Sequence, residues 1–422
     1  MSNDFAPDPY PGRPKILFIG WAESSHTHAW IDLLAGAELN VRLFALPSAV
    51  PPDTWRVRTY VTIDPPGPLD PHTRLRVFPP KFRRAARLLR KIMEEFRPSG
   101  AARQAEPASI ERALADVIRR WRPDVIHTLG FDPASYFYLR TRQQFRLAGI
   151  GTWVAQARGG PDLALSRYLP DGLEKIRSVL AECDQFVADN APNYEFARSE
   201  GLAPEKCSPL GVVPGTGGMD VQALAAAWQG RPSQRERWIL WPKAYEAPAA
   251  KALPVFEALR LAWDRIRPCR LHLLWVVQPE VRMWFGALPQ EIRESCCLYD
   301  RLPREQVLEM MPRARVLLAP SLTDGVPNSL LEAMAAGAFP IVSPLETITP
   351  LVSEPENVLF ARNLYPNEVA EALARAMSDD ALVDAAAARN LALVRRVADR
   401  ATIGPRVIAY YEQLARAPRA RE

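Results

Sequence analysis

Short apolar runs alternate with amphipathic stretches along most of this chain, and this alternation restricts the fold more than any other feature. The stretches between the runs, such as HAWIDLLAG and SIERALADVIRRW, have a helical period. From Lys15 onward the runs have the length of buried strands: KILFI, VRLFAL, DVIHTLG, GTWVAQA and QFVADN. Strands that alternate with helices pair in parallel, and the helices cover both faces of the sheet. The first half is therefore predicted to be a doubly wound α/β domain.

A second strand series follows a break that begins at PGTGG, near residue 214, and ends after RPSQRER, near residue 236. Its strands are RWILWP, LHLLWVV, CCLYD, VLLAP, FPIVS and NVLFA. We therefore expect an N-terminal Rossmann-like domain at 14–214, a C-terminal Rossmann-like domain at 236–395, and a helical tail at 396–422 that can pack back on the first domain. A length of 422 residues suits two domains. Ligands are expected in the interdomain cleft, at the carboxyl ends of the strands.

The bulk composition is that of an ordinary globular protein, with 48% hydrophobic and 24% charged residues. No apolar run approaches the ~20 residues that cross a bilayer, and the acidic, proline-rich start differs from a secretory signal. These features predict a cytoplasmic protein. The five cysteines show no C-x-x-C spacing, which argues against a zinc or redox motif.

A basic amphipathic helix is predicted at KFRRAARLLRKIMEEFR, residues 81–97. Two interpretations stay open: an ordinary solvated surface, or a peripheral contact with anionic lipid headgroups or an acidic acceptor. Nucleic acid is not expected as a partner, because no aromatic-interleaved basic motif or zinc finger accompanies the arginines.

The segment SLTDGVPNSLLEAMAAGAFPIVS, residues 321–343, carries the strongest chemical signal. A strand, VLLAP, runs into a loop, Pro327 stands where a helix begins, and Gly337 is a natural helix stop. Unpaired amides at such a helix start, together with the helix dipole, favour an anion such as diphosphate. Asp324 in the loop and Glu332 in the helix suit two different hydroxyl-bearing parts of one ligand.

This segment resembles the donor-site signature of retaining glycosyltransferases of family 4, the glycosyl transferases group 1. The matching residues are Asp324, Gly325, Pro327, the run Leu331-Glu332-Ala333-Met334-Ala335, Gly337 and FPIVS. The resemblance is to a subgroup with Asp at the first acid, where the family normally has Glu. It implies a GT-B fold, with two facing Rossmann-like domains and an interdomain cleft. It also implies that Asp324 contacts the transferred sugar and that Glu332 binds the ribose hydroxyls.

The same resemblance extends to other site residues. In RWILWPKAYEAPAAK, Lys243 and Lys251 match the two cations that neutralise the diphosphate. RPDVIHTLG resembles the strand that ends in D-V-x-H, which places His127 at a strand end facing the cleft. The catalytic candidates are thus His127, Asp324 and Lys243, and the acceptor-side candidates are Ser25, His26 and Asp162. The predicted donor-binding residues are Lys243, Lys251, Asp324, Gly325, Val326, Pro327, Asn328, Ser329, Leu330 and Glu332.

The sequence therefore predicts a retaining hexosyltransferase that moves a sugar from a nucleotide diphosphate donor to the hydroxyl of an unknown glycan, lipid or small molecule. Bacterial glycan or glycolipid synthesis is the expected setting. No cofactor is expected, and the lack of a D-x-D motif predicts metal independence. Two alternatives remain: a nucleotide-sugar epimerase of the same fold, and a catalytically weak scaffold that binds a nucleotide or a membrane.

Overall fold

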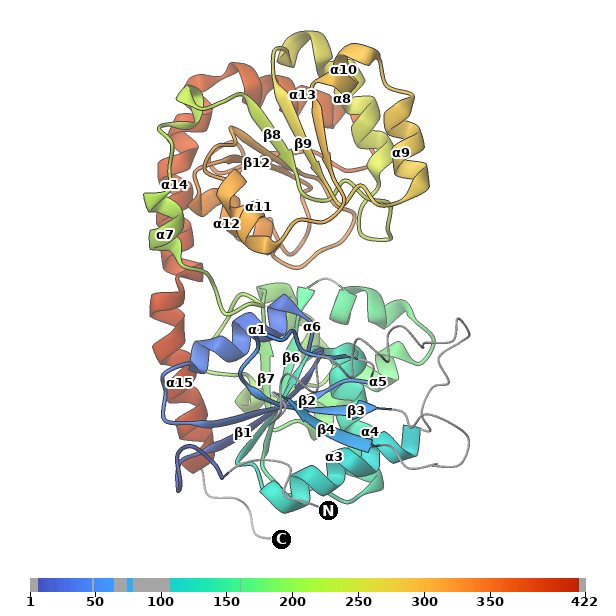
Figure 1. Ribbon diagram of the computed structural model, residues 1–422, viewed down its shortest axis with the longest axis vertical. Helices are drawn as coiled ribbons and strands as arrows, with labels where there is room; N and C mark the ends of the chain where they lie inside the picture. The colour runs from blue at the N-terminus through green and yellow to red at the C-terminus, as the bar shows by residue number, and fades with distance from the viewer. Residues whose placement is uncertain (1–6, 48, 64–73, 79–106, 160, 417–422) are drawn as a thin grey trace.

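The computed structural model describes residues 7–47, 49–63, 74–78, 107–159 and 161–416. Within these residues the chain forms two α/β domains, one below the other in Figure 1. Two long helices at the end of the chain run along one side of the molecule, the first beside the upper domain and the second beside the lower one. The basic segment at 81–97 lies outside the described residues.

The N-terminal sheet has seven described strands in the order β4-β3-β2-β1-β5-β6-β7. All neighbours are parallel except β3 and β4. The strands are β1 (Lys15–Gly20), β2 (Asn40–Ala45), β3 (Arg58–Ile63), β4 (Arg74–Phe78), β5 (Val125–Leu129), β6 (Thr152–Ala157) and β7 (Gln185–Ala188). The helices are α1 (Ser25–Ile31), α3 (Pro107–Trp121), α4 (Tyr136–Gln144), α5 (Gly172–Glu182) and α6 (Ala191–Ser199). The chain reverses its direction of winding between β1 and β5, so a topological switch point lies there.

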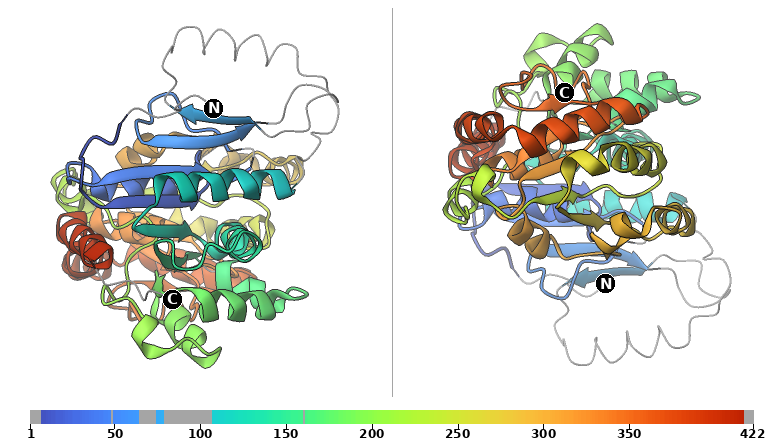
Figure 2. Two further views of the ribbon diagram at one scale, coloured as in Figure 1. Left: turned by 90° about the horizontal axis from the view of Figure 1, so that it is seen from below. Right: turned by 90° about the horizontal axis from the view of Figure 1, so that it is seen from above.

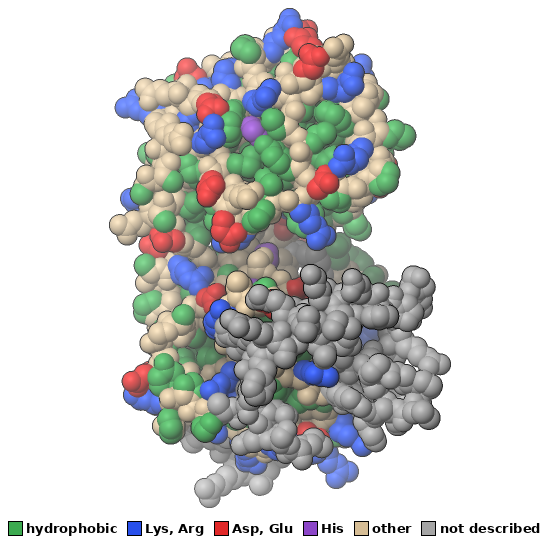
Figure 3. All heavy atoms as spheres, viewed as in Figure 1, with side chains coloured by type: hydrophobic (Ala, Val, Ile, Leu, Met, Phe, Trp, Pro, Cys, Tyr) green, Lys and Arg blue, Asp and Glu red, His purple; other side chains and the backbone are tan. Residues whose placement is uncertain are grey.

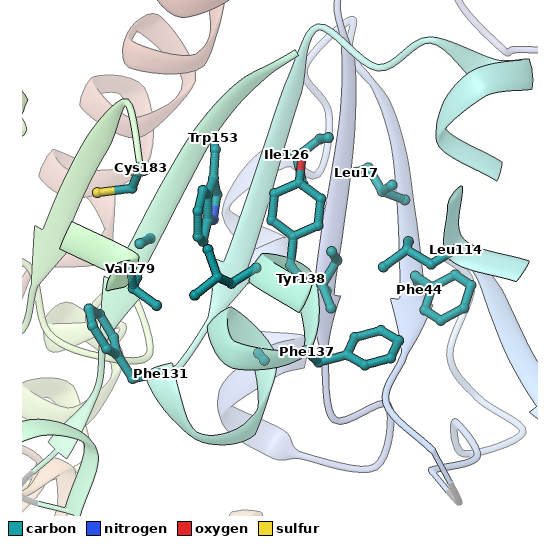
Figure 4. Close-up of a cluster of buried hydrophobic side chains, with 14 of the residues drawn as sticks. Leu17, Phe44, Leu114, Ile126, Phe131, Phe137, Tyr138, Trp153, Val179 and Cys183 are labelled. Atoms are coloured by element: carbon teal, nitrogen blue, oxygen red, sulfur yellow. The ribbon is translucent and has the colours of Figure 1, made fainter. Parts of the chain in front are cut away.

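The two faces of this sheet are buried by separate sets of apolar side chains, as the doubly wound prediction requires. Figure 4 shows one of them, in which Leu17 and Ile126 from the strands lie near Tyr138 of α4. The Tyr138 ring meets the Trp153 ring edge to face, with centroids 5.0 Å apart. The five predicted strands of this half are confirmed, whereas β3 and β4 were not predicted.

The C-terminal sheet has six described strands, all parallel, in the order β10-β9-β8-β11-β12-β13. They are β8 (Trp238–Trp241), β9 (Arg270–Leu274), β10 (Cys296–Tyr299), β11 (Val316–Ala319), β12 (Phe339–Val342) and β13 (Leu359–Phe360). The helices are α7 (Val221–Ala226), α8 (Ala252–Ile266), α9 (Pro279–Gly286), α10 (Gln290–Glu294), α11 (Arg304–Met310), α12 (Asn328–Ala335) and α13 (Pro366–Ser378). All six strands were predicted, and the switch point of this sheet lies between β8 and β11.

The last two helices belong to different domains. Helix α14 (Asp380–Ala398) packs Leu393 and Val394 into the C-terminal core, and α15 (Arg400–Arg416) packs Ile403 and Tyr411 into the N-terminal core. The chain passes between the domains twice: once before α7, and again between α14 and α15. These two crossings are in contact at Met219, whose amide donates to the Ala398 carbonyl at 2.9 Å. The two crossings therefore lie side by side, as Figure 2 also shows from the ends of the molecule.

Candidate functional site

The switch points of the two sheets face each other across a cleft. Figure 3 shows the molecule hollowed between the domains. Side chains meet across it: the amide of Asn328 lies 3.4 Å from Nδ1 of His26, and Arg167 lies 3.7 Å from the carboxylate of Glu346. Because ligands of open α/β sheets bind beyond the carboxyl ends of the strands at the switch point, this cleft is the candidate site.

Lys243, which follows β8, and Asp324, which follows β11, form an ion pair at the C-terminal switch point. The Nζ atom of Lys243 also lies 3.4 Å from Oγ of Ser321. On its other side, the Asp324 carboxylate accepts the amide of Gly325 at 2.9 Å. Two residues that are 81 positions apart in sequence are thus brought into contact, both only partly exposed. The structure thus places a cation and a carboxylate side by side at the carboxyl ends of β8 and β11.

Lys251 stands at the start of α8 and forms an ion pair with Glu246 at 2.6 Å. Its backbone is fixed by Asn363, which accepts the Lys251 amide at 2.9 Å and donates to its carbonyl at 3.2 Å. Both predicted diphosphate cations therefore lie on the loop after β8, and each already has a carboxylate partner. Glu246 and Asn363 were not predicted from the sequence.

Helix α12 begins at Asn328, one residue later than predicted, and Pro327 precedes it in an extended conformation. Within the described residues, the amides of Asn328 and Ser329 have no acceptor, so they are available to an anion. The predicted helix stop is confirmed: Gly337 has φ +78°, and Ala338 donates back to the Ala333 carbonyl at 2.9 Å.

Glu332 lies on α12 with its side chain mostly buried, and it forms an ion pair with Arg304 at the start of α11. Arg304 was not predicted. It begins the helix after β10, so sequence distance gave no sign that it lies beside Glu332. The carboxylate expected to bind ribose hydroxyls is thus oriented by a guanidinium.

The loop between Asp324 and α12 touches the N-terminal domain at Gly325. A Cβ atom at this position would lie 2.6 Å from Cα of Gly159 and 2.9 Å from Oδ2 of Asp189. The Asp189 carboxylate accepts the amide of Gly159 at 2.6 Å, and burial raises the pKa of Asp189 to about 6. Only a residue without a side chain fits between the domains at this point.

The acceptor-side candidates occupy different environments. Ser25 and His26 begin α1 and are exposed to the cleft. The pKa of His26 is lowered to about 4, because the walls of the cleft reduce its hydration and the cations Arg158 and Arg304 lie nearby. His26 is therefore neutral at pH 7. Asp162 is instead buried, accepts the Arg158 amide at 2.6 Å, and has its pKa raised to about 7 by that burial.

The expected placement of His127 at a strand end facing the cleft is wrong. His127 is the central residue of β5 and has no exposed surface. Its Nδ1 atom lies 2.5 Å from the hydroxyl of Tyr411, and that hydroxyl accepts the indole N–H of Trp30 at 3.0 Å. Burial lowers the pKa of His127 well below the ordinary value, so the buried imidazole is neutral. The D-V-x-H pattern did not reveal that α15 covers this strand.

Arg158 directly follows β6 and was not among the predicted site residues. Its Nε atom donates to the side chain of Gln156 at 3.0 Å, while its Nη2 atom is buried without a partner. Within the described residues it forms no ion pair. A cation in this position, close to His26, adds positive potential to the N-terminal wall of the cleft.

A metal site is not evident in the part of the chain that the structure describes: no cluster of three or more His, Cys, Asp or Glu side chains is placed to hold an ion. In the same residues, no helix has the length and apolar character to cross a membrane.

Comparison with known proteins supports the fold on which this geometry rests. The family model described as "Glycosyl transferases group 1" matches residues 251–379, which include the Asp324 loop and α12. No curated protein matches the chain at a significant level of sequence similarity.

Among solved structures, the sucrose-phosphate synthase of Thermosynechococcus elongatus is 16% identical, with a TM-score of 0.64 over 95% of this chain and 99% of that one. HepE of Anabaena in complex with UDP-glucose is 12% identical, with a TM-score of 0.63 over 94% of this chain and 98% of that one. The putative UDP-N-acetylglucosamine 2-epimerase of Listeria monocytogenes is 13% identical, with a TM-score of 0.59 over 94% and 95%. The chain thus has the GT-B fold of two Rossmann-like domains, and a segment of its C-terminal domain matches the model of the group 1 glycosyl transferases.

Proposed function

We propose that this protein is a retaining glycosyltransferase of family 4 that transfers a hexose from a nucleotide diphosphate to an acceptor hydroxyl. The observation that carries the proposal is the group around α12: the Lys243–Asp324 ion pair before the helix, free amides at its start, and Glu332 inside it. The match to the glycosyltransferase family model over the same segment supports it.

In the proposed complex, the diphosphate lies against Lys243, Lys251 and the amides of Asn328 and Ser329. These groups stabilise a leaving group whose negative charge grows as the glycosidic bond breaks. Asp324 accepts hydrogen bonds from the sugar hydroxyls, and Glu332 accepts them from the ribose. The ion pair with Lys243 fixes the direction of the Asp324 carboxylate.

Retention follows if the acceptor attacks from the face that the diphosphate leaves, with a phosphate oxygen taking the acceptor proton. No protein nucleophile is required for this route. His26, which we propose lies on the acceptor side, is a weak base because its pKa is lowered to about 4, so it does not compete for that proton. We also propose that diphosphate binding depends on these cations and amides rather than on a metal ion. Activity should then persist in EDTA.

The acceptor is proposed to be a bacterial glycan or glycolipid precursor. The basic sequence at 81–97 supports a peripheral contact with an anionic membrane surface. Flotation of the protein with vesicles that contain anionic lipid tests this contact, and failure to float returns the segment to the role of a solvated surface.

The test of the proposed function is incubation with a panel of nucleotide sugars and simple glycan or lipid-linked acceptors, followed by mass spectrometry of the products. Transfer with release of the nucleoside diphosphate supports the proposal, and the anomeric configuration of the product tests retention. Free isomerised sugar nucleotide would instead identify an epimerase, and binding without turnover would identify a scaffold.

The variant Glu332→Ala tests the donor site itself by isothermal titration with the nucleotide selected from the panel. We expect the affinity to fall at least tenfold, because the ribose loses a charged hydrogen-bond acceptor. An unchanged affinity for the nucleotide in this variant would sink the assignment of the donor site. The variant Glu294→Ala, at the exposed end of α10, serves as the control.

A further inference from the structure

Trp275 is the least expected side chain near the site. It directly follows β9, 41% of its surface is exposed, and its backbone adopts φ +67°. A left-handed conformation is unfavourable for a bulky residue. Because the indole remains partly exposed, the free energy gained by burying it offsets little of this cost. Backbone strain of this kind persists where the surrounding structure holds it, and it gathers at ligand sites.

The loop that carries Trp275 is joined to the loop that carries the two lysines. The Ala244 amide, next to Lys243, donates to the carbonyl of Leu274 at 3.1 Å. Three residues beyond Trp275, the side chain of Gln278 donates to the Glu246 carbonyl at 2.9 Å. Trp275 is therefore held in a fixed position beside the proposed diphosphate site.

Arg301 lies over the indole of Trp275, with its guanidinium carbon 4.8 Å from the ring centroid. Within the described residues, Arg301 forms no ion pair, unlike Arg304, which is paired with Glu332. The loop after β10 is held against this one, because the Val276 amide donates to the Tyr299 carbonyl at 3.1 Å. An arginine that stacks on tryptophan presents a flat cationic and aromatic surface.

The four loops follow neighbouring strands, so their side chains form a row along the carboxyl edge of the sheet. In the strand order β11-β8-β9-β10, the row is Asp324, Lys243, Trp275 and Arg301. Adjacent strands lie about 4.8 Å apart, so the row spans roughly 14 Å. Its chemistry changes from a carboxylate that suits sugar hydroxyls, through a cation that suits diphosphate, to an aromatic surface.

We propose that Trp275 and Arg301 form a stacking platform for the base of the donor nucleotide. The inference rests on the proposed function, since it places the base at the end of the row that is opposite the sugar. The position of Glu332 supports this orientation of the nucleotide along the row. Its partner Arg304 is three residues from Arg301, so the proposed ribose site lies next to the platform. The platform stacks on any planar base, and it makes Trp275 a determinant of nucleotide affinity rather than of sugar choice.

The experiment is isothermal titration of UDP, ADP and GDP, with inorganic diphosphate as the probe that lacks a base. For Trp275→Ala we expect about a 5- to 150-fold loss of affinity for the best nucleoside diphosphate, the range found for single base–aromatic stacks. Affinity for inorganic diphosphate should stay within twofold of wild type. An unchanged nucleotide affinity, or an equal loss for inorganic diphosphate, would overturn the proposal.

Two further variants separate the ring from the backbone. Trp275→Phe should keep most of the affinity, because a ring remains. Trp275→Gly suits the left-handed conformation and should melt at a higher temperature than Trp275→Ala, yet bind nucleotide as poorly. If Trp275→Gly binds nucleotide as well as wild type, the alanine variant lost affinity because of its strained backbone and not because the ring is missing. The platform would then be rejected.

Trp238→Ala is the matched control, because Trp238 lies under Arg313 at 4.0 Å at the other end of β8, away from the cleft. This variant should keep wild-type nucleotide affinity, and a loss as large as that of Trp275→Ala would overturn the platform. A wild-type protein that binds none of the three nucleoside diphosphates would overturn the proposed function together with this inference. Nucleotide binding that ignores Trp275 would overturn the inference alone.

Discussion

Gly325 offers the sharpest test of how the two domains cooperate. In Gly325→Ala, the new Cβ would lie 2.6 Å from Cα of Gly159, whereas ordinary contacts begin near 3.4 Å. The backbone of Gly325 does not have a positive φ, so alanine suits its own loop. The clash is therefore between the two domains, which must separate by at least about 0.8 Å to relieve it.

Neither side of this contact can yield easily. Gly159 is tied to Asp189 by a hydrogen bond of 2.6 Å. On the other side, the hydroxyl of Thr347 donates to the carbonyls of Asp324 at 2.9 Å and of Gly325 at 3.1 Å. Because both loops are fixed within their domains, the added methyl group widens the cleft instead of moving one loop.

The expected result is a fall in kcat of about 100-fold, since a misplacement near 1 Å between reacting groups has effects of this size. This corresponds to about 2.7 kcal/mol of activation free energy. The melting temperature should change little, because each domain core is untouched. The assay is initial-rate kinetics with the donor and acceptor found in the panel, together with calorimetry.

The control is Gly286→Ala at the end of α9, where no atom lies within 4 Å of the added Cβ. It should keep wild-type kcat. If Gly325→Ala transfers sugar at the wild-type rate, the contact between Gly325 and Gly159 does not set the working distance between the domains. A fall in melting temperature as large as that of a core variant would equally refute the reasoning.

Two other predictions concern buried polar groups of the N-terminal domain. Tyr411→Phe leaves both His127 and Trp30 without their partner, so the free energy of unfolding in urea should fall by about 2 to 4 kcal/mol; a change below 0.5 kcal/mol would show that the three groups repack. Asp162→Asn tests the raised pKa of about 7: a carboxyl with a raised folded-state pKa stabilises the fold fully below about pH 4, and this stabilisation is lost as the pH rises to 7. The stability of the variant relative to wild type should therefore increase by about 2 to 3 kcal/mol between pH 5 and 7.5, and an equal difference at both pH values would contradict the assigned pKa.

The sequence predicts most of the strands that are buried on both faces, because a parallel sheet covered by helices needs nearly continuous apolar runs. The exception is β3, which is buried but was missed because threonines interrupt the apolar residues of its sequence RTYVTI. The edge strand β4 was also missed, because its sequence RLRVF places arginines between apolar residues. Pairing at the sheet edge, and not a local pattern, makes this segment a strand.

The loop that contains Asp324, which we propose binds the donor, and α12 could be predicted because their residues are contiguous in sequence. A strand, a loop acid, a proline and a helix follow one another within 23 residues, so their order in the sequence predicts their arrangement in space. The ion-pair partners could not be found in this way. Arg304 is 28 positions from Glu332, and Lys243 is 81 positions from Asp324, so only the strand order brings each pair together.

The position of His127 shows the opposite case, in which a local pattern misleads because a distant element decides the environment. The pattern D-V-x-H is compatible with a strand end at the cleft, but Tyr411, 284 positions later, covers the histidine. Helix α15, which buries His127, also returns the chain to the N-terminal domain. It begins beside Met219, where the chain first passed to the C-terminal domain. Since both crossings run along one side of the molecule, we expect any opening of the cleft to be a rotation about that side. Such a rotation would carry the row from Asp324 to Arg301 away from His26 as one rigid edge, so the proposed function predicts that the donor binds to one domain and that transfer requires both.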